Sequence, residues 1–218
     1  MVIIHLTDIH GHTDRLEPVL THAGKADVIL LTGDLTHFGG KEEAEPVIET
    51  IRQFPGRILA LPGNCDHPSV QAYLEKEGVS LHRRAEVING LGFAGMGLSL
   101  HCPGKTPGEI TEKELKEGLG GAHAQLPDKA PWILLTHEPP YRTRNDRVFF
   151  GKHVGSRSVR NFIEKHEPLV CFTGHIHEGT GIDTIGITSI VNPGPLKTGH
   201  YGYAEIDKGV VKVEIRKA

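Results

Sequence analysis

The sequence has few of the residues that mark several classes of protein. It contains three cysteines, two methionines and one tryptophan, and 27 acidic side chains outnumber 24 lysines and arginines. Cys65, Cys102 and Cys171 show no C-x-x-C spacing, which argues against a disulfide framework and against a zinc site made of thiolates. The formal net charge of −3 provides no overall positive field to hold nucleic acid or an anionic membrane.

Long apolar runs are missing as well. The longest uncharged stretch, 87–104, is interrupted by glycines and therefore predicts strands and loops, not a membrane helix. The amino-terminal residues MVIIHLTD lack the basic region and the cleavage site of a signal peptide. We therefore expect a cytoplasmic protein without a membrane partner.

Histidine, by contrast, is abundant: 15 histidines outnumber the 7 phenylalanines, 4 tyrosines and 1 tryptophan together. The length fits one large domain, which we expect to span residues 1–218. Apolar runs alternate with amphipathic stretches, and the last part of the chain is rich in predicted strands. This order predicts a layered α/β domain. The expected strands are 2–6, 28–31, 57–61, 132–135, 169–172, 185–191, 201–206 and 210–215, and the expected helices are 16–23, 41–54, 69–77 and 156–166.

Five of the apolar runs lead directly into side chains that bind metals. They are Asp8 and His10, Asp34, Asn64, His137, and the pair His175 and His177. Each residue alone is more often a cap or a solvated side chain, but seven at strand exits are expected to converge, because ligands gather at the carboxyl ends of strands. Mixed oxygen and nitrogen donors suit Mn, Fe, Zn, Ni or Co. Seven donors are too many for one ion and suit two ions that share a carboxylate.

The spacing of these residues resembles that of a known family. Asp8-x-His10, Gly33-Asp34, Gly63-Asn64-x-Asp66, His137 and Gly174-His175-x-His177 are similar to the signature of calcineurin-like metallophosphoesterases. The turn Asn192-Pro193-Gly194-Pro195 resembles the small bacterial and archaeal, Icc-related branch of that family. The resemblance implies a four-layer α-β-β-α sandwich with a dimetal site at the carboxyl ends of the strands.

The resemblance also implies roles for these residues. Asp8, His10 and His177 would bind one metal, and Asn64, His137 and His175 would bind the other. Asp34 would bridge the two ions together with a hydroxide that attacks phosphorus in line with the leaving group. Asp34, Asn64 and His137 are therefore the expected catalytic residues.

One position departs from the family pattern. Many members have histidine directly after the asparagine, and that histidine is credited with assisting the leaving oxygen, whereas this chain has Cys65. A thiol is a poorer donor, so diesters and aryl esters should be hydrolysed better than alkyl monoesters. Cys65 either fills space or contacts a metal. His67 is a candidate to compensate, and Asp66 is expected to orient a neighbouring histidine.

Other residues are expected beside the substrate. His12 follows the first motif, and His101 ends a glycine-rich segment. The segment from Arg142 to Lys152 is basic and follows His137, so we interpret it as a loop that steers anions, or else as a solvated loop or an oligomer contact. A homo-oligomer is therefore one of the assemblies that the sequence allows.

The sequence predicts a dinuclear metal-dependent phosphoesterase, with a phosphodiesterase acting on a small anionic phosphoester as the favoured form. A phosphomonoesterase, or a nuclease on short oligonucleotides, would use the same site. A non-catalytic metal-binding scaffold is the alternative from a different class.

Overall fold

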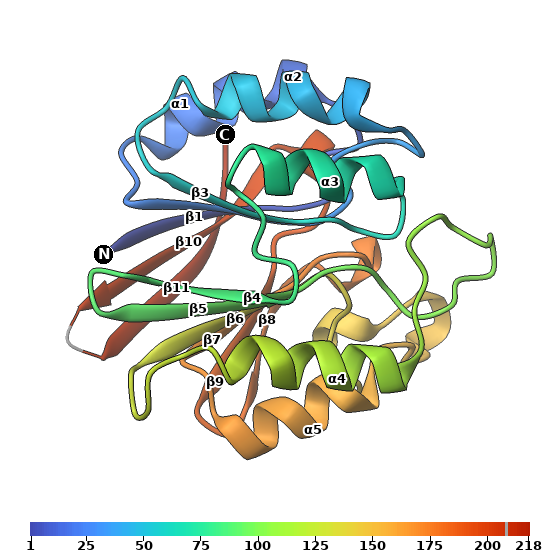
Figure 1. Ribbon diagram of the computed structural model, residues 1–218, viewed down its shortest axis with the longest axis vertical. Helices are drawn as coiled ribbons and strands as arrows, with labels where there is room; N and C mark the ends of the chain where they lie inside the picture. The colour runs from blue at the N-terminus through green and yellow to red at the C-terminus, as the bar shows by residue number, and fades with distance from the viewer. Residues whose placement is uncertain (208) are drawn as a thin grey trace.

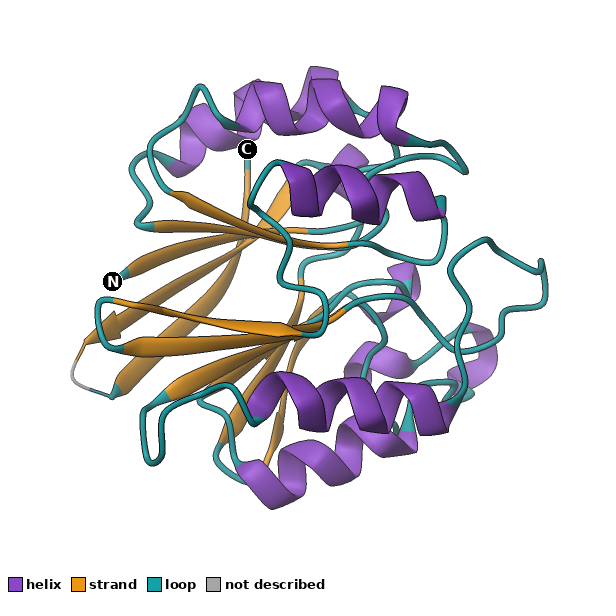
Figure 2. Cartoon of the chain, viewed as in Figure 1, coloured by secondary structure: helices purple, strands orange, loops and turns teal. Residues whose placement is uncertain are grey.

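Two β-sheets lie face to face, and helices cover the outer face of each sheet (Figures 1 and 2). The computed structural model describes residues 1–207 and 209–218. The prediction of a four-layer α-β-β-α sandwich is thus confirmed. Within the part of the chain that is described, no helix has both the length and the apolar character needed to cross a bilayer.

The first sheet has three parallel strands at one side and an antiparallel pair at the other. Its order is β11 (Val210–Lys217), β10 (His200–Asp207), β1 (Val2–Leu6), β2 (Val28–Thr32) and β3 (Arg57–Leu61). β1 pairs in parallel with β2, and β2 with β3, so their carboxyl ends lie at one edge. The covering helices are α1 (Thr13–Ala23), α2 (Lys41–Ile51) and α3 (Pro68–Lys76).

The second sheet has a parallel centre between two antiparallel edge strands. Its order is β4 (Arg84–Ile88), β5 (Leu91–Met96), β6 (Trp132–Thr136), β7 (Val170–Phe172), β9 (Thr188–Asn192) and β8 (Gly181–Ile185). β5, β6, β7 and β9 run in parallel. The covering helices are α4 (Glu112–His123) and α5 (Arg157–His166).

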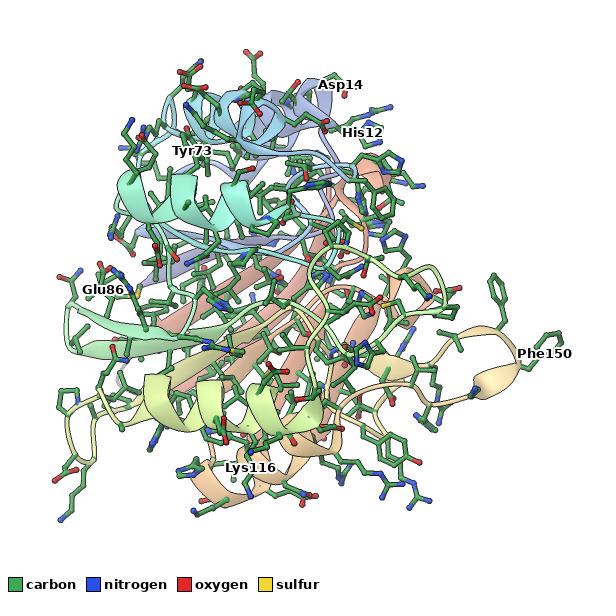
Figure 3. The ribbon with its side chains drawn as sticks, turned by 45° about the vertical axis from the view of Figure 1, so that its right-hand side comes forward. His12, Asp14, Tyr73, Glu86, Lys116 and Phe150 are labelled. Carbon is green, nitrogen blue, oxygen red and sulfur yellow. The ribbon has the colours of Figure 1, made fainter. Side chains whose placement is uncertain are left out.

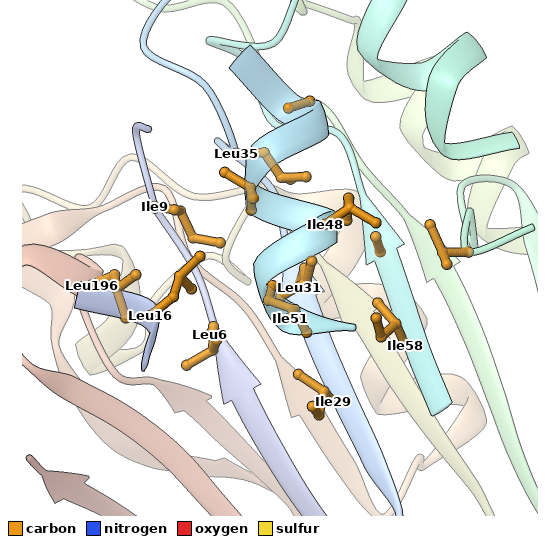
Figure 4. Close-up of a cluster of buried hydrophobic side chains, with 14 of the residues drawn as sticks. Leu6, Ile9, Leu16, Ile29, Leu31, Leu35, Ile48, Ile51, Ile58 and Leu196 are labelled. Atoms are coloured by element: carbon orange, nitrogen blue, oxygen red, sulfur yellow. The ribbon is translucent and has the colours of Figure 1, made fainter. Parts of the chain in front are cut away.

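The alternation of side chains along the strands builds the layers. On β2, Leu30 packs between the sheets, whereas its neighbours Ile29 and Leu31 pack under the helices. Figure 4 shows Leu31 beside Ile51 of α2, and Ile29 belongs to the same buried cluster as Leu16 and Ile48. Each such side chain stabilises the fold by about 1.5–3 kcal/mol when fully buried. Because both faces are buried, these strands are continuous apolar runs, as expected for parallel strands.

Some elements differ from the sequence prediction. The expected strand 185–191 is instead the β8–β9 hairpin, which turns at Gly186 and Ile187. The helix expected at 41–54 ends at Ile51. Helix α4 was not predicted, because its three glycines lower helix propensity, but it is supported by a capping box between Thr111 and Glu114. β10 and β11 form the expected hairpin; Lys208 of the predicted turn lies outside the described residues.

Candidate metal centre at the shared edge of the two sheets

The residues predicted to bind metal come from loops of both sheets. The loops after β1, β2 and β3 carry the first four, and those after β6 and β7 carry the last three. The amino terminus starts β1 at the left of Figure 1, so these loops lie at the right-hand edge. The two sheets therefore present their carboxyl ends to the same space.

The backbone bends sharply at four of the seven positions. Asp8, His10, Asp34 and His175 have φ angles of 51°, 47°, 52° and 67°, in the left-handed region that non-glycine residues rarely adopt. Neighbouring loops hold two of them: the amides of Asp8 and His10 donate to the carbonyls of Gly33 and Asp34 at 3.1 and 2.9 Å. Such backbone strain costs about 1–3 kcal/mol per residue and is concentrated at functional sites.

Glycine precedes three of the ligand candidates because the chains approach too closely for a side chain. A Cβ on Gly33 would overlap the imidazole of His137, and one on Gly63 would overlap Asp34. A Cβ on Gly174 would overlap Thr7 and crowd the Asp8 carboxylate. The glycines are thus needed for the seven side chains to meet.

Asp8, His10 and His177 form one group of donors. The Nε2 atoms of the two histidines are 3.4 Å apart, and His177 Nε2 lies 3.4 Å from Asp8 Oδ1. Their donor atoms all lie within 4.8 Å of one another. Asp8 is buried, and the backbone amide of His175 donates to both of its oxygens at 3.2 Å.

Asp34, Asn64 and His137 form the adjoining group. His137 Nε2 lies 3.0 Å from Asn64 Oδ1 and 3.3 Å from Asp34 Oδ1. The other ring nitrogen, Nδ1, is 2.7 Å from the Thr32 carbonyl oxygen, to which it donates. This bond fixes the orientation of the ring and turns Nε2 towards the two oxygens, as backbone acceptors do for metal-binding histidines.

Asp34 joins the two groups. Its Oδ1 faces His137, and its Oδ2 lies 3.8 Å from His10 Nε2. The Cys65 amide donates to Oδ1 at 2.8 Å and holds the carboxylate in place. The Asp34 carboxylate thus directs one oxygen towards each group of donors, which is the arrangement that a bridging ligand needs.

His175 stands at the side of the second group. Its ring centroid is 5.1 Å from that of His137, while its Nε2 lies 3.6 Å from Cys102 Sγ. Burial lowers the pKa of His175 to about 4, so the ring is neutral and its lone pair is available to a metal at pH 7.

The charges in the site stabilise one another. Burial opposes a charge on His137, but the Asp34 carboxylate outweighs it and raises the pKa of His137 to about 9. Burial also opposes ionisation of Asp34, yet the charge of His137 and its hydrogen bond hold the Asp34 pKa well below its usual value. A buried carboxylate therefore stays ionised here and available to a cation.

The donor set fits divalent transition metals. The site brings carboxylate oxygens, an amide oxygen and imidazole nitrogens to within 3.0–3.8 Å of one another. An imidazole nitrogen that carries no proton is an acceptor, as the oxygens are. Acceptors brought so close repel unless a proton or a cation lies between them. Mixed nitrogen and oxygen ligands are the set that first-row transition metals prefer.

An open cleft of about 910 Å³ adjoins both groups. His12 and His101 line it, as the sequence predicted, and so does Cys65, whose Sγ is near the donor atoms of His10 and Asp34. Burial raises the pKa of the Cys65 thiol, which is therefore neutral at pH 7. The structure adds cleft residues that sequence reasoning missed: His37, Phe38, Cys102, Glu138, His153 and Lys197.

Asp66 does not orient a histidine as expected. Its buried carboxylate instead accepts from the amides of Leu35, Thr36 and Gly63 at 3.2, 2.8 and 2.7 Å, and from the Thr36 hydroxyl at 2.8 Å. Burial raises the pKa of Asp66 to about 6. Asp66 thus ties the Asp34 loop to the Asn64 loop.

Two other predicted residues lie away from the cleft. His67 is exposed at the start of α3, so it is not placed to compensate for Cys65. Arg142 is exposed and is not among the residues that line the cleft. Lys152 of the same loop does line it. Figure 3 shows this loop reaching outward, with Phe150 at its tip.

Glu138 is the most deeply buried of the residues that were missed. It directly follows His137, and its carboxylate accepts from the Leu100 amide at 2.9 Å. Burial raises its pKa to about 8. Its place beside a ligand candidate was visible in the sequence, but its burial depends on the 97–109 loop, which the sequence did not place.

Comparison with known proteins identifies the family of this chain. A model of the calcineurin-like phosphoesterase family matches residues 1–179. The uncharacterized protein MJ1162 of Methanocaldococcus jannaschii is 38% identical over 202 residues, which are 89% of this chain and 88% of that protein.

Two more distant relatives carry names of activities. CpdA of Escherichia coli, a 3',5'-cyclic adenosine monophosphate phosphodiesterase, is 28% identical over 82% of this chain and 64% of its own length. GpdQ of Arcobacter nitrofigilis, named as a probable glycerophosphodiester phosphodiesterase, is 25% identical over 76% of this chain and 60% of its own length. The matched regions thus span less than two thirds of either protein.

Solved structures share the fold. TT1561 of Thermus thermophilus superimposes with a TM-score of 0.74 at 20% identity, covering 98% of this chain and 97% of that chain. The purple acid phosphatase PPD1 of yellow lupin gives 0.59 at 12% identity, covering all of this chain and 51% of that chain.

Proposed function

Because the chain belongs to the calcineurin-like phosphoesterase family, we propose that it is a dinuclear metal-dependent phosphoesterase that hydrolyses small anionic phosphodiesters. The single observation that carries the proposal is the convergence of seven metal-binding side chains from five strand ends. The named activities of the two distant relatives, both phosphodiesterases, support the choice of substrate class.

The residues divide into two ion sites with one shared member. Asp8, His10 and His177 would hold one ion, and Asn64, His137 and His175 the other. Asp34 would contact both, because its two oxygens face the two groups. A pair of divalent ions held there, with Mn, Fe, Zn, Ni or Co as candidates, supplies positive charge to the phosphoryl oxygens and lowers the pKa of a bound water.

The remaining residues position the substrate and the ligands. Thr32 and Asp66 keep the ligand loops in register through their hydrogen bonds. Lys152 and Lys197 line the cleft and attract the phosphoester anion. The neutral thiol of Cys65 carries no positive charge to offer a poor leaving group, which favours diesters with good leaving groups over alkyl monoesters.

The proposal is tested by turnover of bis(p-nitrophenyl) phosphate by the manganese-loaded protein. We expect hydrolysis of this diester to exceed that of p-nitrophenyl phosphate, and Asp34→Ala to lower kcat/KM by at least about a thousandfold, since it removes the shared ligand. Asp128→Ala, which removes an exposed aspartate outside the cleft, is the matched control and should retain activity.

Other outcomes separate the alternatives. Faster turnover of the monoester would favour a phosphomonoesterase, and a preference for short oligonucleotides would favour a nuclease. Two bound ions per chain without turnover of any ester would favour the scaffold. Activity that persists in Asp34→Ala would defeat the assignment of this site.

A further inference from the structure

The proposed reaction leaves one role without a residue, the supply of a proton to the departing oxygen. Cys65 occupies the position at which many members of the family have histidine, and a thiol is a poorer proton donor than an imidazolium. His67 is exposed outside the cleft. A substitute must therefore line the cleft, hold a proton that it can release, and be fixed in orientation.

His153 meets these geometric conditions. It lines the cleft together with His10, Asp34 and Asn64, and its Nδ1 lies 2.6 Å from Asp146 Oδ1. The side chain of His153 is 24% exposed and that of Asp146 is fully buried. Nε2 of His153 makes no hydrogen bond to any residue that the structure describes, so this nitrogen is free for a ligand.

Asp146 is fixed by the loop that contains both residues. Its carboxylate also accepts from the backbone amides of Arg142, Thr143 and Gly155 at 3.1, 3.0 and 3.1 Å. An acceptor held in this way places a proton on Nδ1 and fixes the orientation of the ring. The pair is therefore built before substrate arrives.

We propose that His153, oriented by Asp146, is the general acid that protonates the leaving oxygen of the phosphodiester. This inference rests on the proposed function. As an oxygen of water bonds to phosphorus, the bond from phosphorus to the leaving oxygen breaks and the Nε2 proton of His153 moves to that oxygen. The products are a monoester and an alcohol, and the proton released by water restores the imidazolium. Asp146 is a positioning residue in this scheme.

A second histidine of the cleft provides a matched control. His101 Nδ1 pairs with Glu109 Oε2 at 2.9 Å, but the side chain of His101 is 72% exposed. An imidazole so exposed is solvated and is not held towards the substrate. The two variants His153→Gln and His101→Gln thus remove the same chemical group from a fixed and a loose position.

The experiment compares methyl p-nitrophenyl phosphate with methyl phenyl phosphate, since phenol is the poorer leaving group. In His153→Gln we expect kcat/KM to fall about a hundredfold or more for the phenyl ester, and less than about tenfold for the p-nitrophenyl ester. Manganese content and melting temperature should match those of the wild type. His101→Gln should change the two rates by the same factor and should not show the selective loss for the phenyl ester.

Further arms keep the test decisive. Asp146→Asn, which disturbs the tautomer, should reproduce the selective loss if it folds, and added imidazole should restore phenyl ester turnover in His153→Gly. Two results with His153→Gln would overturn this inference but not the proposed function: an equal loss for both esters, or no loss. A selective loss in His101→Gln or in Glu138→Gln in place of His153→Gln would overturn it as well. Inactivity of the manganese-loaded wild type on both esters would overturn the proposed function and this inference together.

Discussion

A histidine of this protein takes its role from the partner of its Nδ1. In His137 that nitrogen donates to a backbone carbonyl, which leaves Nε2 to bind a metal. In His153 it donates to the Asp146 carboxylate, which fixes the orientation of the ring in the cleft. In His82 it accepts from the Gly97 amide, which requires the neutral ring. The count of histidines therefore says little until these partners are known.

His82 should make stability depend on pH. Burial lowers its pKa to about 4, while in the unfolded chain it titrates near 6.5. Between these values the unfolded state binds more protons, so the free energy of unfolding should fall as pH drops from about 7 to about 4. His82 accounts for up to about 3 kcal/mol of that loss. Urea unfolding of wild type and His82→Gln at several pH values measures it, and the variant should show a shallower slope. Identical slopes would contradict the assignment.

At the scale of elements, the loops that carry the ligands are joined to one another more than to their own helices. Asp66 connects the loops after β2 and β3, while Thr32 and His137 connect β2 with β6 across the two sheets. The ligands are thus placed by a network of loop contacts, and the strands only bring the loops to the same edge.

Asp66→Ala should destabilise the protein and loosen the metal centre. The substitution leaves three amides and one hydroxyl in the interior without their acceptor, which costs about 3–5 kcal/mol. Urea unfolding measures this loss, and manganese titration should show weaker binding because Asp34 and Asn64 are no longer held in register. Asp27→Ala, which removes an exposed carboxylate that accepts from the Val2 amide, should cost less than about 1 kcal/mol. Equal costs for the two variants would show that Asp66 does not support the site.

At the scale of the whole molecule, the candidate metal centre lies where loops of the two sheets meet. Four of its ligand candidates follow strands of the first sheet and three follow strands of the second. Metal binding to the folded state alone should therefore stabilise the entire molecule, since both sheets must be in place for the site to exist.

Manganese should raise the melting temperature, and the rise should grow with the logarithm of the free metal concentration above the Kd. At free metal about a hundred times the Kd, the gain is about 2.7 kcal/mol, or roughly 5–10 °C for a chain of this size. Calorimetry with manganese and with a chelator measures the shift, and Asp34→Asn should reduce it. A single transition in both conditions is expected if residues 1–218 form one domain; two separate transitions would contradict that prediction.

The sequence alone was enough to predict a layered α/β domain and a set of candidate ligands, while the four-layer arrangement came from the resemblance to a known family. Apolar runs such as 28–31 and 57–61 are local patterns, and the ligand candidates follow them within a few residues, so neighbouring residues contain this information. The strand limits predicted at 185–191 were wrong. The end of β8 and the start of β9 both carry apolar residues, so in the sequence they look like one strand, although a tight turn separates them. Helix α4 was missed because its packing against β5 outweighs the low propensity of its glycines.

Only the tertiary structure decided which polar groups meet. Asp66 was expected beside a histidine but binds three backbone amides, and Glu138 becomes a buried cleft residue because the 97–109 loop covers it. His153 and Asp146 carry no signal in the sequence, since their pairing depends on how one loop closes on itself. Hydrophobic patterning is encoded by residues close in sequence, whereas hydrogen bonds and charges act over a few ångströms in space, between groups that only folding brings together.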